Sequence, residues 1–122
     1  MDASEIKTEW GSIRITDNAL SAIVNMTALS VPGVARMDNS FVHDLSSMIS
    51  RSEHTDGVHV VFRKDTVDIS LYVVVYHGMR IPDLVLRLQE NVKTAVETMG
   101  GMIVSSVDVY VQSIEFDGIQ SH

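Results

Sequence analysis

The chain has no cysteine, which excludes disulfide bonds, thiolate nucleophiles and cysteine-based zinc sites, and fits a reducing compartment. Basic residues are also scarce, because nine Lys and Arg stand against sixteen Asp and Glu, for a formal net charge of −7. Nucleic-acid backbones are held by several Lys or Arg contacts, and interfacial membrane helices carry such residues on their polar face. The composition therefore argues against nucleic-acid partners and against direct membrane insertion.

Long hydrophobic runs are missing as well. The longest uncharged apolar run, Ile69 to Tyr76, is far shorter than the roughly 20 residues that a transmembrane helix needs. The N-terminus, MDASEIKTEWG, is acidic and polar, whereas a signal peptide begins with basic residues followed by an apolar stretch. We therefore expect a cytoplasmic protein, for which membrane association requires a partner.

The residues that are present suffice for one core. The chain has 122 residues, 45% of them hydrophobic and 20% charged, which indicates a single folded domain. The predicted division is a flexible N-terminal tail over residues 1–10, one domain over 11–117 and a C-terminal tail over 118–122. In the first tail, Trp10 is expected to dock onto the domain because burial of its large ring is favourable.

The first half of the domain alternates between strand and helix patterns. Residues 12–15 alternate polar and apolar side chains as a short strand does, and Thr16 then supplies a helix N-cap. The helix is expected to end at Pro32-Gly33, after an apolar stripe formed by Ala19, Leu20, Ile23, Val24, Ala28 and Val31. Residues 34–37 suit a strand or a connector. The Ser-rich segment 38–56 has apolar residues at helical spacing, which predict a short helix near 41–51.

The second half is more regular. Alternating runs over 58–63 and 67–76 predict a β-hairpin, and an amphipathic helix follows from Pro82 to Gly101, because Pro suits a first helical turn and Gly a left-handed C-cap. The predicted apolar side of this helix consists of Leu84, Val85, Leu88, Val92, Val96 and Met99. A last strand begins near Val107, with a bulge near Gln112-Ser113 where the alternation changes register.

The expected fold class is α+β, in the order β-α-β-(short α)-β-β-α-β, with two amphipathic helices packed on one face of a small β-sheet. In the hairpin's second strand, one set of alternate residues is expected to face the helices: Val67, Ile69, Leu71, Val73 and Val75. The pattern leaves open whether the sheet is wholly antiparallel.

Catalytic and metal-binding patterns are weak throughout. The five histidines show no i,i+4 pairing, no G-x-S-x-G is present, and Gly100-Gly101 closes a helix where a phosphate loop would open one. Asp65 and Asp68 form a carboxylate pair in sequence, but turn chemistry and solvation explain them. We therefore predict no enzyme activity, no cofactor and no metal site.

The sheet face turned away from the helices is the more informative feature. It is expected to carry an apolar and Tyr-rich set of side chains, which is typical of a partner or self-association surface. The candidate interface residues are His59, Val61, Tyr72, Val74, Tyr76 and Tyr110. The alternative is that these are scattered β-formers, since Tyr and Val favour strands wherever they lie.

Several segments in the same order resemble the alkaline shock protein family, also called the Gls-type envelope stress response family of Gram-positive bacteria. The matching segments are GSIRITDNALSAI, VPGVARM, GVHVVF, VDISLYVVVYHGMRIPDLVLRLQENVKTAVETMGG and VSSVDVYVQSI, which cover roughly residues 11–116. Their order and spacing carry the resemblance. The departure lies in residues 38–56, where the family often has a glycine-rich stretch and a basic segment.

The resemblance implies a cytoplasmic protein without catalytic residues that supports cell-envelope homeostasis under stress. It further implies self-association and recruitment to the membrane by a small membrane-anchoring protein. The leading hypothesis is therefore a non-enzymatic interaction module. The alternative, from other relatives of the family, is a regulator of fatty-acid synthesis that acts on acetyl-CoA carboxylase. A third class, an RNA-binding module, is disfavoured by the charge and by the lack of a G-x-x-G loop.

Overall fold

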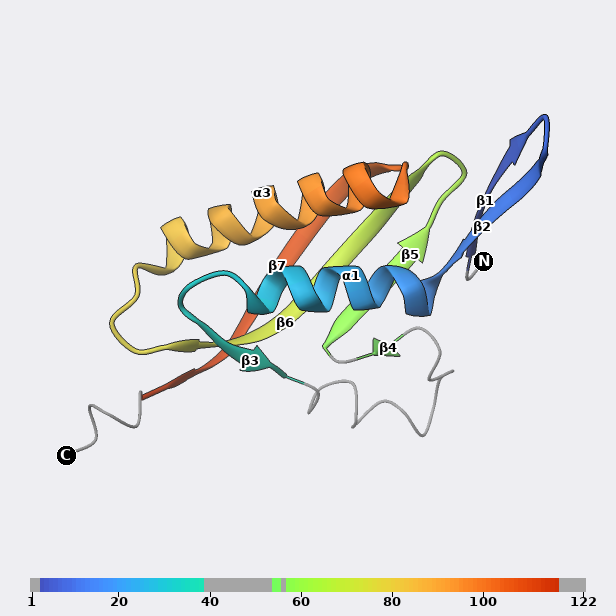
Figure 1. Cartoon of the computed structure of the whole chain (residues 1–122). Helices are drawn as coiled ribbons and strands as arrows, with labels where there is room; N and C mark the ends of the chain where they lie inside the picture. Colours follow the sequence, from blue (N-terminus) through green and yellow to red (C-terminus); the bar gives the residue numbers. More distant parts are fainter. Residues whose placement is uncertain (1–2, 39–53, 56, 117–122) are drawn as a thin grey trace.

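The computed structural model describes residues 3–38, 54–55 and 57–116, and it has the α+β fold that the sequence predicts. Two helices and seven strands are formed by these residues (Figure 1). Their bounds are β1 Ala3–Thr8, β2 Gly11–Thr16, α1 Asp17–Leu29, β3 Val34–Met37, β4 His54–Thr55, β5 Val58–Phe62, β6 Thr66–Tyr76, α3 Ile81–Gly100 and β7 Ile103–Glu115. The short helix predicted near 41–51 and the C-terminal tail lie outside the described residues.

The main sheet is organised around β6. One side of β6 pairs with β7 in parallel, and the other side pairs antiparallel first with β5 and then with β3. Tyr72 lies where β5 gives way to β3, because its N–H donates to the Gly57 carbonyl at 2.9 Å and its carbonyl accepts from the Asp38 N–H at 2.8 Å. The sheet is therefore mixed, and the parallel pair arises because α3 carries the chain back before β7 begins.

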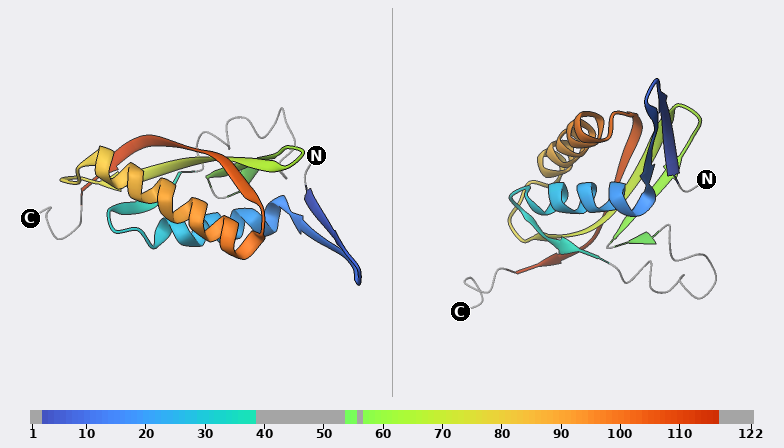
Figure 2. Two further views of the ribbon diagram at one scale, coloured as in Figure 1. Left: turned by 90° about the horizontal axis from the view of Figure 1, so that it is seen from above. Right: turned by 45° about the vertical axis from the view of Figure 1, so that its right-hand side comes forward.

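Both helices lie on one face of this sheet, as predicted (Figures 1 and 2). The alternate residues of β6 that were expected to face them are all fully buried in the core, together with Leu20 and Val24 of α1 and Leu88 and Val92 of α3. Each such side chain contributes about 1.5–3 kcal/mol by leaving water, so this layer supplies most of the favourable burial.

The predicted start of α1 and both predicted ends of α3 are confirmed, whereas α1 ends at Leu29, before the predicted stop at Pro32-Gly33. The Thr16 hydroxyl accepts a hydrogen bond from the Ala19 N–H at 3.2 Å and caps α1. Pro82 lies in the first turn of α3, and Gly101 closes that helix in the left-handed conformation with φ 71°. One assignment on α3 is wrong, because Met99 is 61% exposed at the last turn, beyond the sheet-facing stripe.

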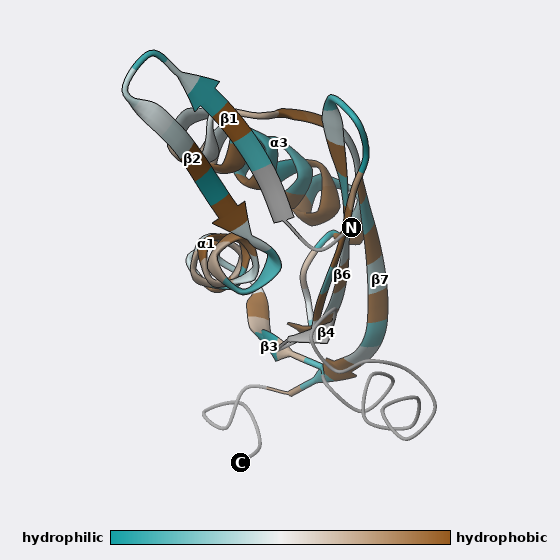
Figure 3. Ribbon diagram, turned by 90° about the vertical axis from the view of Figure 1, so that its right-hand side faces the viewer, coloured by the Kyte–Doolittle hydropathy of each residue, from teal (hydrophilic) through white to brown (hydrophobic). Residues whose placement is uncertain are grey.

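The N-terminal residues differ from the prediction. Residues 3–8, expected in a tail, form β1 and pair along their whole length with β2, from Ala3↔Thr16 to Thr8↔Gly11. Figure 3 shows this hairpin extending away from the main sheet on the side of the helices. Trp10 therefore does not dock as predicted: it sits in the hairpin turn, where there is no core to cover it, and is 89% exposed.

The predicted bulge in the last strand is confirmed. Val111 pairs with Val73, and the next residue of β6, Val74, pairs with Ser113, so Gln112 is the extra residue. A second irregularity near the start of β7 skips Ser105 between Val104 and Ser106. These two shifts decide which β7 side chains lie on each sheet face.

Candidate functional site: the outer sheet face

The sheet side opposite the helices is called here the outer sheet face, and its central feature is a pair of stacked tyrosines. Tyr72 of β6 and Tyr110 of β7 are register partners, and their rings stack with centroids 4.9 Å apart and 11° between the planes. The structure places all six predicted interface residues on the strands of this face: His59, Val61, Tyr72, Val74, Tyr76 and Tyr110.

These six side chains differ in accessibility. Tyr110 is 46% exposed and Tyr76 is 36% exposed, whereas His59, Val61 and Tyr72 are half-buried. Val74 is only 1% exposed, so its assignment as a contact residue is wrong. Its register partners in the sheet are Arg36 of β3 on one side and Ser113 of β7 on the other.

Two ion pairs flank the tyrosines, one at each end of the face. Arg63 Nε lies 2.6 Å from an Asp68 carboxylate oxygen, and Arg36 Nε lies 3.2 Å from a Glu115 carboxylate oxygen. The second pair joins β3 to β7 across β6. Each of these two pairs is locally neutral, and Asp108 of β7 lies beside the aromatic rings as well.

Asp68 connects three other side chains of the face. One carboxylate oxygen accepts from the hydroxyls of Ser105 and Ser106, and the other accepts from Arg63. The Ser105 hydrogen bond, followed by the Arg63 hydrogen bond, holds the pKa of Asp68 below its ordinary value of 3.8. The carboxylate therefore stays ionised and fastens β7 to β6 at the Ser105 irregularity.

The pKa of Tyr72 is shifted upward, in contrast to that of Asp68. Burial, followed by the neighbouring Tyr110 and Asp108, raises the pKa of the Tyr72 phenol above its ordinary value of 10.0. The phenol stays neutral at any physiological pH. It is thus a permanent hydrogen-bonding group at the centre of the face, and it carries no charge that a partner would have to desolvate.

The outer edge of β7 is partly covered by α3. Gln89 Nε2 donates to the Val107 carbonyl at 2.9 Å, and a Glu97 carboxylate oxygen accepts from the Val104 N–H at 3.0 Å. Lys93 pairs with Glu97 at 2.9 Å, and together with the Val104 N–H it lowers the pKa of that carboxyl. Side chains of α3 therefore satisfy edge groups that would otherwise attract another strand.

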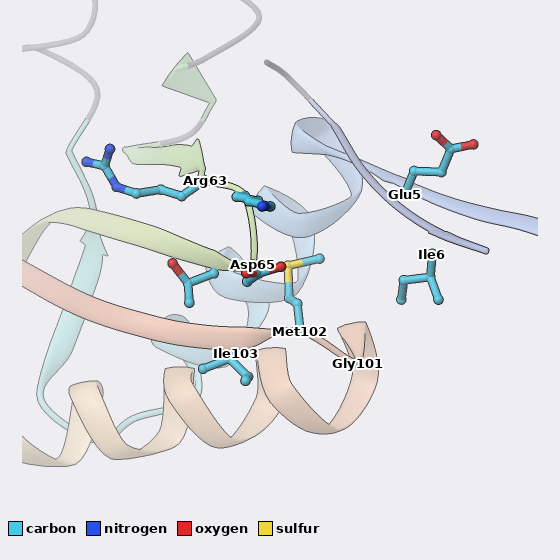
Figure 4. Close-up of a pocket in the computed structure, with 9 residues that line it drawn as sticks. Glu5, Ile6, Arg63, Asp65, Gly101, Met102 and Ile103 are labelled. Atoms are coloured by element: carbon cyan, nitrogen blue, oxygen red, sulfur yellow. The ribbon is translucent and has the colours of Figure 1, made fainter. Parts of the chain in front are cut away.

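A separate cavity of about 430 Å³ lies at the hairpin end of the sheet (Figure 4). Glu5 and Ile6 line it from β1, residues 63–66 from the β5–β6 turn and the start of β6, and residues 101–103 from the α3–β7 connection and the start of β7. Its charged groups are of both signs, and Glu5 and Arg63 are already in ion pairs within the chain. Among the described residues no group of three His, Asp or Glu side chains is placed to hold a metal ion.

Sequence reasoning missed the residues that frame the outer sheet face. Arg36 and Glu115 are far apart in the chain, and their pairing depends on β3 and β7 flanking β6, which pattern alone does not reveal. Ser105 and Ser106 stand in a sequence context that is typical of the surface. Their only signal is the interrupted alternation before Val107.

Comparison with known proteins identifies the family. The model of the alkaline shock protein family, which is described as having a "cell envelope-related function", matches residues 5–116. The chain belongs to the alkaline shock protein family. The resemblance seen in the sequence segments is thereby confirmed, and the function of the family is related to the cell envelope.

Several relatives of this alkaline shock family protein come from Gram-positive bacteria. The chain is 27% identical to the uncharacterized protein YqhY of Bacillus subtilis over 110 residues, which are 90% of this chain and 82% of YqhY. It is 28% identical to the uncharacterized Spy1614 of Streptococcus pyogenes over 116 residues, which are 93% of this chain and 96% of Spy1614. The match to the solved structure of MamM CTD H264E covers 80% of this chain and 95% of the MamM chain, at 14% identity and a TM-score of 0.49.

Neither helix in the described part of the chain is long and apolar enough to cross a membrane.

Proposed function

We propose that this member of the alkaline shock protein family is a non-enzymatic protein–protein interaction module that supports the cell envelope through its outer sheet face. The observation that carries the proposal is the Tyr72–Tyr110 stack, which lies between two ion pairs whose partners both belong to this chain. Interfaces between proteins combine an aromatic centre with a polar rim, and this face has both.

The energetics of the face favour a protein partner. Tyr supplies a large contact area with few rotatable bonds, so little conformational entropy is lost when a partner covers the two rings. Arg36 and Arg63 are already neutralised by Glu115 and Asp68, so they are poor ligands for phosphate. The same surface is therefore better suited to a protein than to nucleic acid.

The proposed partner is a small membrane-anchoring protein that holds this module on the cytoplasmic side of the membrane. A chain of net charge −7 is repelled by the anionic lipids of that surface, so recruitment by a protein is favoured over direct contact. The cell-envelope-related function of the family agrees with such recruitment.

The test is capture of the tagged protein from lightly crosslinked native cells, with identification of the recovered proteins by mass spectrometry. The variant Tyr72→Glu/Tyr110→Glu places two charges at the centre of the face. The matched control, Asn91→Glu/Thr94→Glu, adds the same charge to exposed positions of α3. Circular dichroism and urea unfolding establish that both variants are folded.

A small membrane protein that is recovered with the wild type and the control but lost with the tyrosine variant supports the proposal. Equal recovery with a folded tyrosine variant overturns the assignment of the outer sheet face. Recovery of acetyl-CoA carboxylase subunits in place of a membrane protein overturns the anchoring role and favours the fatty-acid synthesis alternative.

A further inference from the structure

Helix α1 has an exposed face without charge, which is unusual for a surface helix. Its only charged residue is Asp17, which is 6% exposed, and its solvent side includes Met26 at 61% and Leu29 at 46% exposure. The companion helix α3 provides a comparison within the same layer. Its exposed Leu86 is flanked on the helix surface by the exposed charged residues Asp83 and Glu90, at i−3 and i+4.

The exposed apolar residues of α1 form a stripe with a defined order of sizes. Ala19, Ala22, Met26 and Leu29 are all exposed, and their spacing of three, four and three residues is that of a coiled-coil seam. We call these four residues the α1 stripe. The two small side chains come first along the helix and the two large ones come last.

This order makes the α1 stripe complementary to itself in one orientation. If a second α1 packs antiparallel, with the two-fold axis at the level of Val24, Ala22 of each copy faces Met26 of the other. Ala19 then faces Leu29 in the same way. Each large side chain thus fills the space above a small one, which favours close knobs-into-holes packing. A parallel arrangement would set large against large and small against small.

We propose that the α1 stripe is the contact between two copies of this chain, which pack their α1 helices antiparallel about a two-fold axis. A two-fold contact requires a surface that is complementary to itself, and the α1 stripe has this property in both size and charge. Two copies of net charge −7 repel each other, and a contact without charged residues adds no further repulsion at the interface itself.

The size of the contact sets its strength. A helix of 13 residues is roughly 20 Å long, so one α1 against another buries less than the roughly 800 Å² per partner of a standard interface. The dimer is therefore weak in dilute solution and forms where the protein is concentrated. Its two outer sheet faces remain free, because α1 lies on the opposite side of the sheet (Figure 2). A dimer can then engage two partners at once.

Sedimentation equilibrium of the full chain over a wide concentration range tests the contact. Met26→Glu is expected to weaken dimerisation at least about tenfold, because it places a charge inside an apolar contact. Leu86→Glu is the matched control, since Leu86 is a similarly exposed apolar residue on the other helix, and it is expected to leave dimerisation unchanged. A wild type that stays monomeric throughout, or equal effects of the two variants, would overturn the proposal.

The absence of cysteine permits a direct test of the orientation. Ala22→Cys and Met26→Cys proteins that carry different tags are mixed and oxidised, and the mixed 22–26 disulfide is expected to exceed both homodimers. Dominant 22–22 and 26–26 products would indicate parallel helices, and no crosslink would indicate no α1 contact; either result overturns the proposal. The contact is independent of the outer sheet face, so the Tyr72→Glu/Tyr110→Glu variant is expected to dimerise as the wild type does.

Discussion

Tyr72 and Tyr110 occupy opposite positions on the parallel strands β6 and β7, and their rings stack at 4.9 Å on the face that the helices leave open. Stacked aromatic pairs contribute about 0.5–1.5 kcal/mol beyond the area that they bury. The pair therefore has two roles, since it ties β7 to the sheet and also forms the centre of the proposed contact surface.

A double-mutant cycle of Tyr72→Ala and Tyr110→Ala, followed by urea unfolding, measures the first role. The expected coupling free energy is about 0.5–1.5 kcal/mol. The cycle of Tyr76→Ala with Tyr110→Ala is the control, because Tyr76 lies opposite Glu115 in the register, and its coupling to Tyr110 is expected to be near zero. Equal coupling in both cycles would show that the stack has no energy of its own.

Val74 gives a second prediction, because it lies on the same face as the tyrosines but is buried. Because it is 1% exposed, Val74→Ala leaves a cavity and is expected to lower the free energy of unfolding by about 1–3 kcal/mol. Val61→Ala makes the same chemical change at a half-buried position of β5, and its cost is expected to be smaller. Thermal or urea unfolding of both variants decides this, and a Val74→Ala cost no larger than that of Val61→Ala contradicts the burial.

Gly57 provides a third prediction, which separates backbone strain from steric contact. Both Gly57 (φ 76°) and Gly101 (φ 71°) have positive φ, but a Cβ on Gly57 would lie 3.0 Å from the Tyr72 carbonyl oxygen, whereas Gly101 has Ile6 Cδ1 at 3.9 Å. Gly101→Ala is expected to cost about 1–2 kcal/mol from the left-handed conformation alone. Gly57→Ala is expected to cost more, because it also pushes apart the β5–β6 junction. Equal unfolding free energies for the two variants would refute the steric part.

The sequence predicts the helices and strands of this fold better than it predicts which of them lie side by side. Alternation identified β5 and β6 and the side of β6 that is buried, and the cap at Thr16 and the glycines after α3 set the helix ends, because these signals are local. Val74 shows the limit. Its position in the alternation predicts the outer face correctly, but alternation alone does not predict that a residue on this face is 1% exposed.

The N-terminal hairpin shows a different limit. Ile6 and Ile13 are opposite each other in β1 and β2, yet a short mixed-charge segment such as 3–8 has no strong strand signal by itself. Trp10 was expected to be buried because of its size, but a turn that projects from the domain leaves even a large ring in water. Composition predicts which residues gain by burial, whereas topology decides which of them find a core.

Asp68 gives the last prediction, which concerns acid. Its folded-state pKa lies below the ordinary value of 3.8, chiefly because of Ser105 and then Arg63. A carboxyl whose pKa is lowered by folding stabilises the protein above its unfolded-state pKa, and this contribution disappears as the pH falls through the folded-state value. The difference in unfolding free energy between the wild type and Asp68→Asn is therefore expected to be constant near neutrality and to shrink below about pH 4.

Ser105→Ala removes the largest cause of the shift and is expected to lessen this acid dependence while Arg63 still pairs with the carboxylate. Urea unfolding of the three proteins between about pH 7 and pH 2.5 makes the comparison, and a wild-type advantage that persists unchanged in acid would show that Asp68 does not fasten β7 to β6 through its charge.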